Sequence, residues 1–245
     1  MPIKALRDPN ASTTGLFDEL WQLDLRWFEP PNYSRGGWSG VARQKLSIAG
    51  KELNVFIKRQ DRHLTRTWNH WLSGIPTFQK EYANIQRLLA LDIPTLEPLY
   101  YGKQGKKAIL VTKALDDYQS LDKLKPGELT SQQRSALLKS LANTVRTLHD
   151  HRLQHNCLYP KHLFARETTQ NWDVRLIDLE KLRWQPWRRR MVLRDLSSLV
   201  RHASRNWTTT DRLRFFKAYV DESRLSASSK KLWRQIAAKA ASKRR

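Results

Sequence analysis

The sequence predicts an α+β protein with two lobes, a small sheet-bearing lobe followed by a helical one. Three observations support this prediction. Short apolar runs separated by turn residues dominate the first 112 positions. After residue 130, apolar residues recur three or four positions apart, as on one face of a helix. The third observation is a lysine, a glutamate and an aspartate in an order that suits binding of a nucleotide phosphate.

The first lobe, residues 1–112, is expected to contain a lead-in segment, a glycine-rich turn, five strands and one helix. Residues 1–20 form the irregular or partly helical lead-in, Ala49-Gly50-Lys51 is a hairpin turn, and Trp68–Gly74 is an irregular insert. Pro76 opens the helix, which ends at Asp92-Ile93-Pro94. The predicted strands are Leu23–Phe28, Val41–Ile48, Leu53–Lys58, Leu99–Tyr101 and Ala108–Val111.

Residues 113–118 are the expected hinge, and residues 119–245 the helical lobe with a basic tail from Lys230. Thr130 is placed to cap a helix whose apolar face is Leu137, Leu138, Leu141, Val145 and Leu148. A short strand pair follows, around Leu163-Phe164 and 174–177. The later helical patterns are Val192–His202, Arg212–Val220 and Lys231–Ala241.

Composition narrows the class of protein. A chain of 245 residues with 40% hydrophobic residues is long enough for real cores. Its one cysteine excludes a disulfide framework and predicts a reducing, cytoplasmic location. The beginning of the sequence does not resemble a signal peptide, and no stretch approaches the roughly 20 apolar residues of a membrane span.

The net charge of +22 predicts anionic partners: nucleic acid, acidic phospholipid or an anionic glycolipid. Basic residues concentrate at Lys181–Arg194, together with Trp184 and Trp187, and in the tail from Lys230. Tryptophan mixed with arginine suits a membrane surface as well as a nucleic acid. A peripheral position at an inner membrane is one interpretation, and a solvated basic face is the other.

The candidate nucleotide site begins with Lys58, at the end of an apolar run, and Glu81, 23 positions later on the predicted helix. Lys58 would reach the α- and β-phosphates and form an ion pair with Glu81. Asp178 follows the apolar residues Leu176-Ile177 and would hold Mg²⁺, with Mn²⁺ as the alternative. This is the order in which a kinase-like fold builds its phosphate and metal site. Glu180 either helps to hold the metal or pairs with an arginine.

The glycine-rich turn contributes Gly36, Gly37, Ser39 and Gly40 as candidate nucleotide-binding residues. Glycine allows backbone N–H groups to approach phosphate oxygens closely. The spacing is not Gly-x-Gly-x-x-Gly, so a simple tight turn is the alternative interpretation.

The expected catalytic loop departs from the kinase pattern, and its candidate catalytic residues are His155, Cys157 and Lys161. Cys157 stands where kinases have the aspartate that orients the acceptor hydroxyl, and His162 stands where they have the metal-binding asparagine. A thiol does not replace a carboxylate base, although phosphoryl transfer depends mainly on positioning and charge stabilisation. His162 is either a metal ligand or a hydrogen-bonding strut.

The stretch from His155 to Phe164 resembles the catalytic loop of the lipopolysaccharide core kinase superfamily (Kdo kinase/WaaP), and is most similar to its InaA branch. Arg35–Val41, Gly74–Phe78 and Ile93–Pro98 resemble the same branch, and the similar stretches run from about Trp27 to Leu199. The resemblance implies a protein-kinase-like two-lobed fold, ATP with Mg²⁺, and inner-core sugars of lipopolysaccharide as acceptor. It also implies that Asp195, in Arg194–Leu199, braces the catalytic loop.

The leading hypothesis is therefore an ATP-dependent phosphotransferase acting on a saccharide or glycolipid of the cell envelope. A pseudokinase that binds nucleotide and acts as an envelope or stress-related scaffold is the first alternative, because Cys157 replaces the catalytic aspartate. A nucleic-acid-binding protein is the second, supported by charge alone. Asp178 and Asp195 are 17 positions apart, which leaves little room for a long activation segment.

Overall fold

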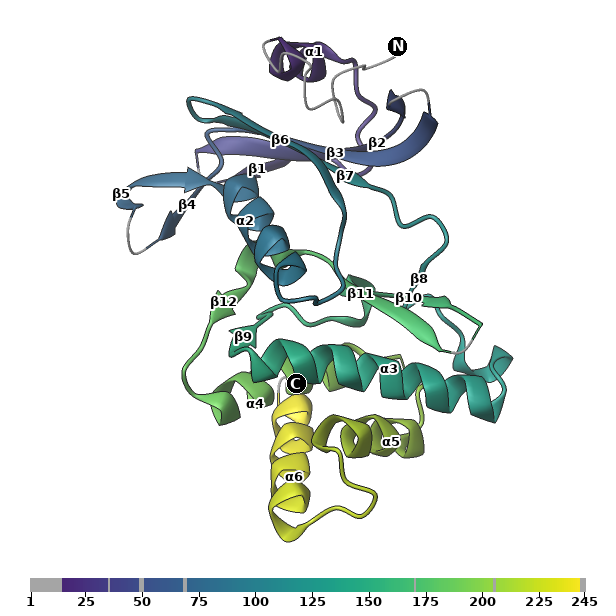
Figure 1. The fold of residues 1–245 in the computed structure, drawn as a ribbon. Helices are drawn as coiled ribbons and strands as arrows, with labels where there is room; N and C mark the ends of the chain where they lie inside the picture. Colours follow the sequence, from purple (N-terminus) through teal and green to yellow (C-terminus); the bar gives the residue numbers. More distant parts are fainter. Residues whose placement is uncertain are drawn as a thin grey trace. The chain divides into compact units, whose positions relative to one another are not determined.

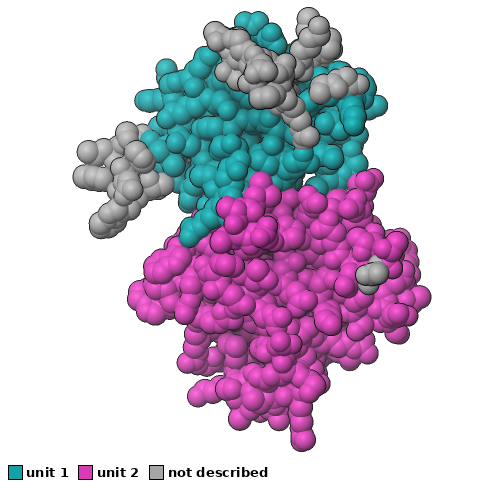
Figure 2. Space-filling model, viewed as in Figure 1, with its two compact units in different colours: residues 1–87, 96–116 teal, residues 88–95, 117–245 magenta. Residues whose placement is uncertain are grey.

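The structure is a computed structural model that describes residues 15–34, 36–48, 51–67, 70–169, 171–204 and 206–242. The chain divides into two compact units (Figure 2). Unit 1 comprises residues 1–87 and 96–116, and unit 2 comprises residues 88–95 and 117–245. The division differs from the sequence-based one at residues 88–95, which join unit 2.

Unit 1 contains a five-stranded antiparallel sheet in the order β1-β2-β3-β7-β6 (Figure 1). The long hairpin of β2 and β3 forms its centre, and β3 pairs with β7 from Asp61 opposite Lys107 to Val55 opposite Lys113. The strands are β1 (Asn32–Ser34), β2 (Gly37–Ile48), β3 (Lys51–Asp61), β6 (Pro98–Gln104) and β7 (Lys107–Lys113).

Two helices lie on opposite faces of this sheet, α1 (Leu16–Gln22) and α2 (Thr77–Leu89) (Figure 1). Side chains alternate between the faces of a strand, so Ile57 and Lys58 of β3 point in opposite directions. Ile57 belongs to the apolar core that includes Leu16, Phe17 and Leu20 of α1. Lys58 points to the face covered by α2, and this alternation places a charged side chain beside that helix.

Several predicted elements of unit 1 need correction. Leu23–Phe28 is not a strand: Trp27 makes one isolated bridge to Ala42, and Pro30 and Pro31, which lack N–H donors, follow. The predicted insert Trp68–Gly74 overlaps a hairpin of β4 (Leu64–Thr67) and β5 (His70–Pro76). That ribbon forms a two-stranded sheet of its own, outside the main sheet.

Other boundaries shift by a few residues. Pro76 is the last residue of β5, and α2 begins at Thr77. The glycine-rich turn is shorter than expected, because β2 already begins at Gly37. The predicted hairpin-turn residues Ala49 and Gly50, and residues 1–14 of the lead-in, lie outside the described residues.

Unit 2 is built around α3 (Ser131–Asp150), with its core face as the sequence predicts. Thr130 caps this helix: its hydroxyl accepts from the Gln133 N–H, and the Gln133 side chain accepts from the Thr130 N–H. The predicted strand pair is the hairpin of β10 (Leu163–Glu167) and β11 (Trp172–Leu176), and β8 (Gln119–Ser120) joins its edge. The short strands β9 (Leu153–Gln154) and β12 (Arg183–Trp184) pair with each other.

Three further helices complete unit 2: α4 (Arg188–His202), α5 (Thr209–Val220) and α6 (Ala227–Ala241). Helix α5 packs on α3, and α6 packs on α4 (Figure 1). Each helix begins three or four residues earlier than predicted, because its first turn is polar and shows no apolar periodicity. Thr208 and Ser226 cap α5 and α6 through the N–H groups of Asp211 and Ser229. The tail residues 243–245 lie outside the described part.

Candidate active site

The predicted ion pair of Lys58 and Glu81 is present in unit 1. Lys58 Nζ donates to Glu81 Oε1 over 2.6 Å. The side chains are 17% and 3% exposed, so the pair lies in a poorly solvated place where removal of one partner is costly. The Lys58 ammonium also lies 5.8 Å from the centre of the Phe78 ring. The arrangement fixes a cation in place.

The glycine-rich segment forms the hairpin of β1 and β2, in which Ser34 pairs with Gly37. Gly36, in the turn, has a φ of 76°, which glycine adopts without strain. A Cβ on Gly37 would lie 2.1 Å from the Asp61 carbonyl oxygen, and one on Gly40 would lie 2.7 Å from the Trp27 ring. Close packing thus accounts for two of the glycines. Ser39 lies on β2 opposite Gln60 of β3. A role for the hairpin in covering phosphates remains a prediction, and Arg35 lies outside the described residues.

A buried histidine that the sequence did not single out connects this hairpin to α2. His63 is 4% exposed, and its Nε2 lies 3.0 Å from the Ser34 hydroxyl. Its Nδ1 lies 3.1 Å from Thr77 Oγ1, and the Thr77 hydroxyl donates to the His63 carbonyl oxygen. Because that hydroxyl donates to the carbonyl, it accepts from Nδ1–H, which leaves Nε2 to accept from Ser34. His63 therefore links β1 to the first residue of the helix that carries Glu81.

In unit 2, Asp195 of α4 holds the backbone of the predicted catalytic loop. Its carboxylate accepts from the N–H groups of His155 at 2.7 Å and Asn156 at 3.0 Å. The same carboxylate lies 3.2 Å from His149 Nε2 of α3, and Asp195 is fully buried. Charge-assisted bonds to backbone N–H groups are strong in such a place. The bracing role that the resemblance implied for Asp195 is confirmed.

His155 lies beneath the loop. It is fully buried, and its Nε2–H donates to the Ile177 carbonyl oxygen over 3.1 Å. Burial lowers the pKa of its imidazole, since a charged ring would lose its hydration there. The structure thus makes His155 a neutral support for the residue that precedes Asp178. The prediction that it acts directly in catalysis needs this correction, because a substrate does not reach a fully buried ring.

Cys157 follows in the loop and is 6% exposed. Burial raises the pKa of its thiol, the Asp178 carboxylate raises it further, and the Lys181 ammonium acts in the opposite direction. The thiol is therefore protonated at neutral pH and is not prepared as a nucleophile or base. Lys161, which the sequence predicts to be a catalytic residue, is exposed in the 3₁₀ turn Pro160–His162, and its role stays a prediction. The sequence did not predict that Lys181 lies close to the Cys157 thiol.

The β10–β11 hairpin places His162 beside Asp178. His162 precedes β10 and Asp178 follows β11 by two residues, and the Ile177 N–H donates to the His162 carbonyl oxygen over 3.0 Å. The backbone of Asp178 adopts the left-handed conformation, with φ of 58°. His162 Nε2 lies 3.3 Å from Asp178 Oδ2.

The chemistry of this pair fits a cation. His162 Nδ1–H donates to the Cys157 carbonyl oxygen over 2.8 Å, so in a neutral ring Nε2 would carry the lone pair. An imidazole lone pair and a carboxylate oxygen facing the same point would repel unless a proton or a metal ion lies between them. One carboxylate and one imidazole suit a metal whose other ligands are phosphate oxygens and water. Within the described residues no three His, Cys, Asp or Glu side chains form a preformed metal site, and Glu180 as a further ligand remains a prediction.

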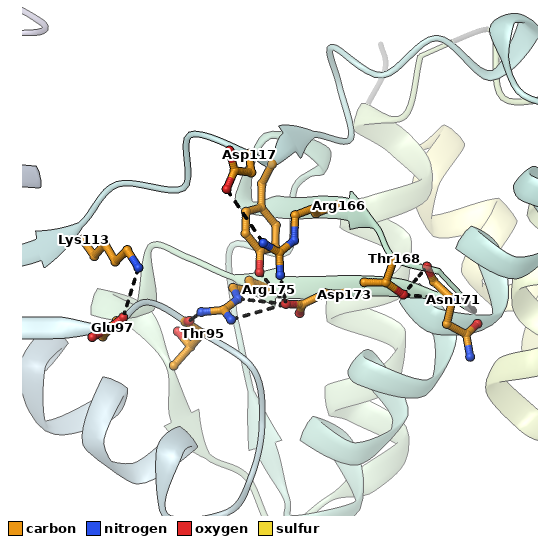
Figure 3. A network of polar contacts seen from close by, with 10 residues as sticks. Thr95, Glu97, Lys113, Asp117, Arg166, Thr168, Asn171, Asp173 and Arg175 are labelled. Atoms are coloured by element: carbon orange, nitrogen blue, oxygen red, sulfur yellow. Dashed lines mark hydrogen bonds and ion pairs between the residues drawn. The ribbon is translucent and has the colours of Figure 1, made fainter. Parts of the chain in front are cut away.

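A polar network supports the same hairpin (Figure 3). Arg175 of β11 donates to the Thr95 carbonyl oxygen over 3.2 Å, and the Thr95 hydroxyl donates to the Leu176 carbonyl oxygen over 2.7 Å. Arg175 also lies 3.3 Å from the Asp173 carboxylate, which accepts from the Tyr118 hydroxyl. These contacts tie residue 95 to β11 and explain why residues 88–95 belong to unit 2. Figure 3 also draws the separate surface pair of Lys113 and Glu97 in unit 1.

Comparisons with known proteins decide the family. The model of the "Lipopolysaccharide kinase (Kdo/WaaP) family" matches residues 18–219. The chain belongs to this family. Protein InaA of Escherichia coli (strain K12) is 28% identical over 197 residues, which cover 76% of this chain and 87% of InaA. The predicted family is confirmed, and InaA is a relative of this chain.

Solved structures confirm the protein-kinase-like fold class. WaaP in complex with acyl carrier protein matches with a TM-score of 0.67 and 19% identity, over 93% of this chain and 92% of that one. Aminoglycoside-3′-phosphotransferase of type VIII matches with a TM-score of 0.53 and 14% identity, over 92% and 98% of the two chains. Family and fold together identify a kinase of the lipopolysaccharide core type, a class that uses ATP and a divalent metal. Among the described residues, no helix is both long and apolar enough to cross a membrane.

Proposed function

We propose that this chain transfers the γ-phosphate of ATP to a hydroxyl group of a lipopolysaccharide core saccharide at the cytoplasmic face of the membrane. The observation that carries the proposal is the buried Lys58–Glu81 pair, with its 2.6 Å contact. An ion pair in a poorly solvated place contributes little net stability. We therefore infer that the pair serves to present a fixed cation to phosphate. The predicted convergence of Lys58 and Asp178 on one nucleotide spans the two units and belongs to this proposal.

Each group has a defined part in the reaction. The Lys58 ammonium binds the α- and β-phosphates, and Asp178 with His162 holds Mg²⁺, which neutralises charge on the phosphates when bound. Mn²⁺ is the alternative metal. An oxygen of the acceptor attacks the γ-phosphorus, the bond to the β–γ bridging oxygen breaks, and ADP leaves. The acceptor proton passes to the transferred phosphate or to solvent, because the protonated Cys157 thiol does not accept it. His155 and Asp195 position the loop.

A pseudokinase is the second candidate, and the Cys157 thiol favours it. General base assistance typically contributes about 10²–10⁴-fold, so its loss lowers turnover to a rate at which nucleotide binding could become the biological activity. The two candidates share the same nucleotide site. They differ in whether phosphate reaches an acceptor.

The test is transfer of radiolabelled γ-phosphate to lipopolysaccharide that has first been dephosphorylated, with Mg²⁺ and then with Mn²⁺. We expect transfer by the wild type and its loss in Asp178→Asn. Asp221→Asn is the matched control, because Asp221 also has a left-handed backbone with φ of 59° but is exposed at the end of α5. WaaP was solved with acyl carrier protein, so the reaction is run with and without that protein. ATP binding without transfer under every condition would favour the pseudokinase.

A further inference from the structure

Apart from Lys181, whose ammonium acts on the Cys157 thiol, the segment Lys181–Arg194, here called the Trp–Arg segment, has no part in the kinase site described above. It contains six basic residues and no acidic one: Lys181, Arg183, Arg188, Arg189, Arg190 and Arg194. Three of them form the first turn of α4. The positive end of a helix disfavours cations, so stability alone gives no reason for three arginines there.

The same segment exposes two tryptophans. Trp184 is 56% exposed and Trp187 is 64% exposed, although tryptophan is normally highly buried. They flank Gln185, which is 6% exposed. A rigid pair of exposed indole rings next to arginines is typical of surfaces that insert into a membrane interface, because the ring is apolar and its N–H is polar.

The tryptophans are held in place by the structure beneath them. Trp184 pairs with Leu153 across β12 and β9, and the Gln185 N–H donates to the Arg152 carbonyl oxygen over 2.8 Å. The Arg152 guanidinium donates to the Pro186 carbonyl oxygen over 2.9 Å. These contacts fix both sides of Gln185, so the two rings are presented by ordered backbone.

The segment itself carries six positive charges and no negative one. Arg188 pairs with Asp150 over 2.6 Å, whereas Arg189 donates to the neutral Gln235 of α6 over 2.9 Å. The Arg190 guanidinium lies 6.0 Å from the centre of the Trp187 ring, a cation–π contact that keeps charge and ring together. Lys231 lies one helical turn before Gln235 and extends the basic surface onto α6.

We propose that the Trp–Arg segment is a docking surface for a bilayer of anionic phospholipid. Charge complementarity and the two exposed indoles select this occupant over a soluble anion, which would use the arginines but not the tryptophans. A nucleic acid would stack its bases on open aromatic faces, and the Arg190 guanidinium is placed over the Trp187 ring. The proposal goes beyond phosphoryl transfer and does not depend on it.

The surface is continuous with the candidate catalytic loop. β9 ends at Gln154, directly before His155, and its partner β12 carries Trp184. The Asn156 side chain donates to the Lys181 carbonyl oxygen over 2.8 Å. Docking of the segment therefore brings the loop that holds Cys157 close to lipid headgroups.

The experiment is vesicle flotation of the full chain without nucleotide, so its outcome is independent of kinase activity. Vesicles of phosphatidylglycerol with phosphatidylcholine are compared with vesicles of phosphatidylcholine alone, at rising salt. We expect binding to the anionic vesicles that weakens as salt screens the charges. Each basic residue near an anionic surface contributes roughly fivefold in affinity, so changing Arg188, Arg189 and Arg190 together to Gln should weaken binding by up to about 10²-fold.

Matched variants separate this surface from general charge. Changing Lys103, Lys123 and Lys139 together to Gln removes the same charge from exposed positions elsewhere and should weaken binding much less. Changing Trp184 and Trp187 together to Ala should weaken binding, whereas Tyr33→Ala, at a 78% exposed aromatic residue, should not. Thermal melting checks that each variant folds, and quenching of wild-type tryptophan fluorescence by spin-labelled lipid gives a readout without mutation.

Three outcomes would overturn the proposal. Equal binding to neutral and anionic vesicles would exclude charge-directed docking. Equal losses in the two triple variants would assign binding to net charge. Displacement from anionic vesicles by a short single-stranded RNA at low concentration would identify nucleic acid as the favoured partner.

Discussion

The two sets of predicted kinase residues, one in each unit, differ in how closely they follow kinase chemistry. In unit 1 the Lys58–Glu81 pair has the partner, burial and 2.6 Å contact expected of a phosphate-binding cation. In unit 2 the loop is braced by Asp195, His162 faces Asp178, and the loop carries Cys157, whose thiol pKa is raised by burial. That Cys157 replaces the catalytic carboxylate stays a prediction.

The difference teaches that the contacts which hold the loop are independent of the side chain at position 157. The N–H groups of His155 and Asn156 anchor the loop by donating to the Asp195 carboxylate, and these bonds do not depend on the side chain at position 157. The loop can therefore keep its shape while its chemistry changes. The predictions below test each set in turn, from the largest expected effect to the smallest.

A carboxylate at position 157 should bring the loop of unit 2 closer to kinase chemistry. Cys157→Asp should raise turnover by about 10²–10⁴-fold, because a carboxylate can orient and deprotonate the acceptor hydroxyl. The affinity for ATP should change little, since Lys58 and Asp178 are intact. Phosphate transfer to dephosphorylated lipopolysaccharide measures the first quantity, and calorimetry the second.

Cys157→Ala is the control for that experiment. If the thiol takes no part in the reaction, the alanine variant should retain wild-type turnover. Loss of activity in Cys157→Ala would show that the sulfur has a specific chemical role. The interpretation of Cys157 as a residue that takes no part in the reaction would then be wrong.

Removing the cation of unit 1 should cost both stability and nucleotide binding. Lys58→Met leaves the Glu81 carboxylate, 3% exposed, without its partner, which should lower the free energy of unfolding by about 3–5 kcal/mol. Lys113→Met breaks a 3.9 Å pair whose side chains are 49% and 42% exposed, and should cost about 0–1 kcal/mol. Urea unfolding measures both.

A double variant separates the two losses. Lys58→Met with Glu81→Leu removes both charges together, so stability should recover, whereas ATP binding should stay lost. Recovery of ATP binding in the double variant would show that Lys58 has no direct contact with phosphate.

Some of this site could be predicted from sequence because its signals are local or ordered along the chain. The Thr130 cap needs one residue three positions away, and Lys58, Glu81 and Asp178 could be recognised by order and context. Asp195 was found through the resemblance, which supplied a contact 40 positions distant that no local pattern encodes.

Other features left no such signal. His63 contacts Ser34, 29 positions away, and Thr77, 14 positions away. A single histidine in a polar stretch of sequence gives no indication that it has two side-chain partners. The attachment of Thr95 to β11 joins residues 81 positions apart, so the assignment of residues 88–95 to unit 2 could not be drawn from the sequence. The first turns of α4, α5 and α6 were missed because they are polar and show no apolar periodicity. Side chains cap α5 and α6, whereas the Trp187 side chain makes no capping bond to α4.

The brace of unit 2 should be measurable separately from its chemistry. Asp195→Asn turns one amide donor toward the N–H groups of His155 and Asn156 and loses charge-assisted bonds, at a cost of about 1.5–3 kcal/mol of unfolding free energy. Asp150→Asn, at a 52% exposed partner of Arg188, is the control and should cost about 0–1 kcal/mol. Hydrogen exchange at His155 and Asn156 should accelerate in the first variant alone, and unchanged protection there would refute the bracing role.

The smallest effect concerns the ionisation of Cys157, the single cysteine of the chain. Burial and the Asp178 carboxylate raise the pKa of its thiol above the ordinary value of 9.0, so at neutral pH less thiolate is present than in an exposed cysteine. Iodoacetamide should label the folded protein more slowly than the urea-unfolded protein, with a rate that climbs through the alkaline range. Since the folded pKa exceeds the unfolded one, the associated stability is fully present below the unfolded pKa and is lost as pH rises through the folded pKa. Asp178→Asn should speed the labelling and Lys181→Gln should slow it, as mass spectrometry can follow. Rapid labelling of the folded wild type at neutral pH would reveal a thiolate, and the catalytic loop would then have to be interpreted as that of a nucleophile.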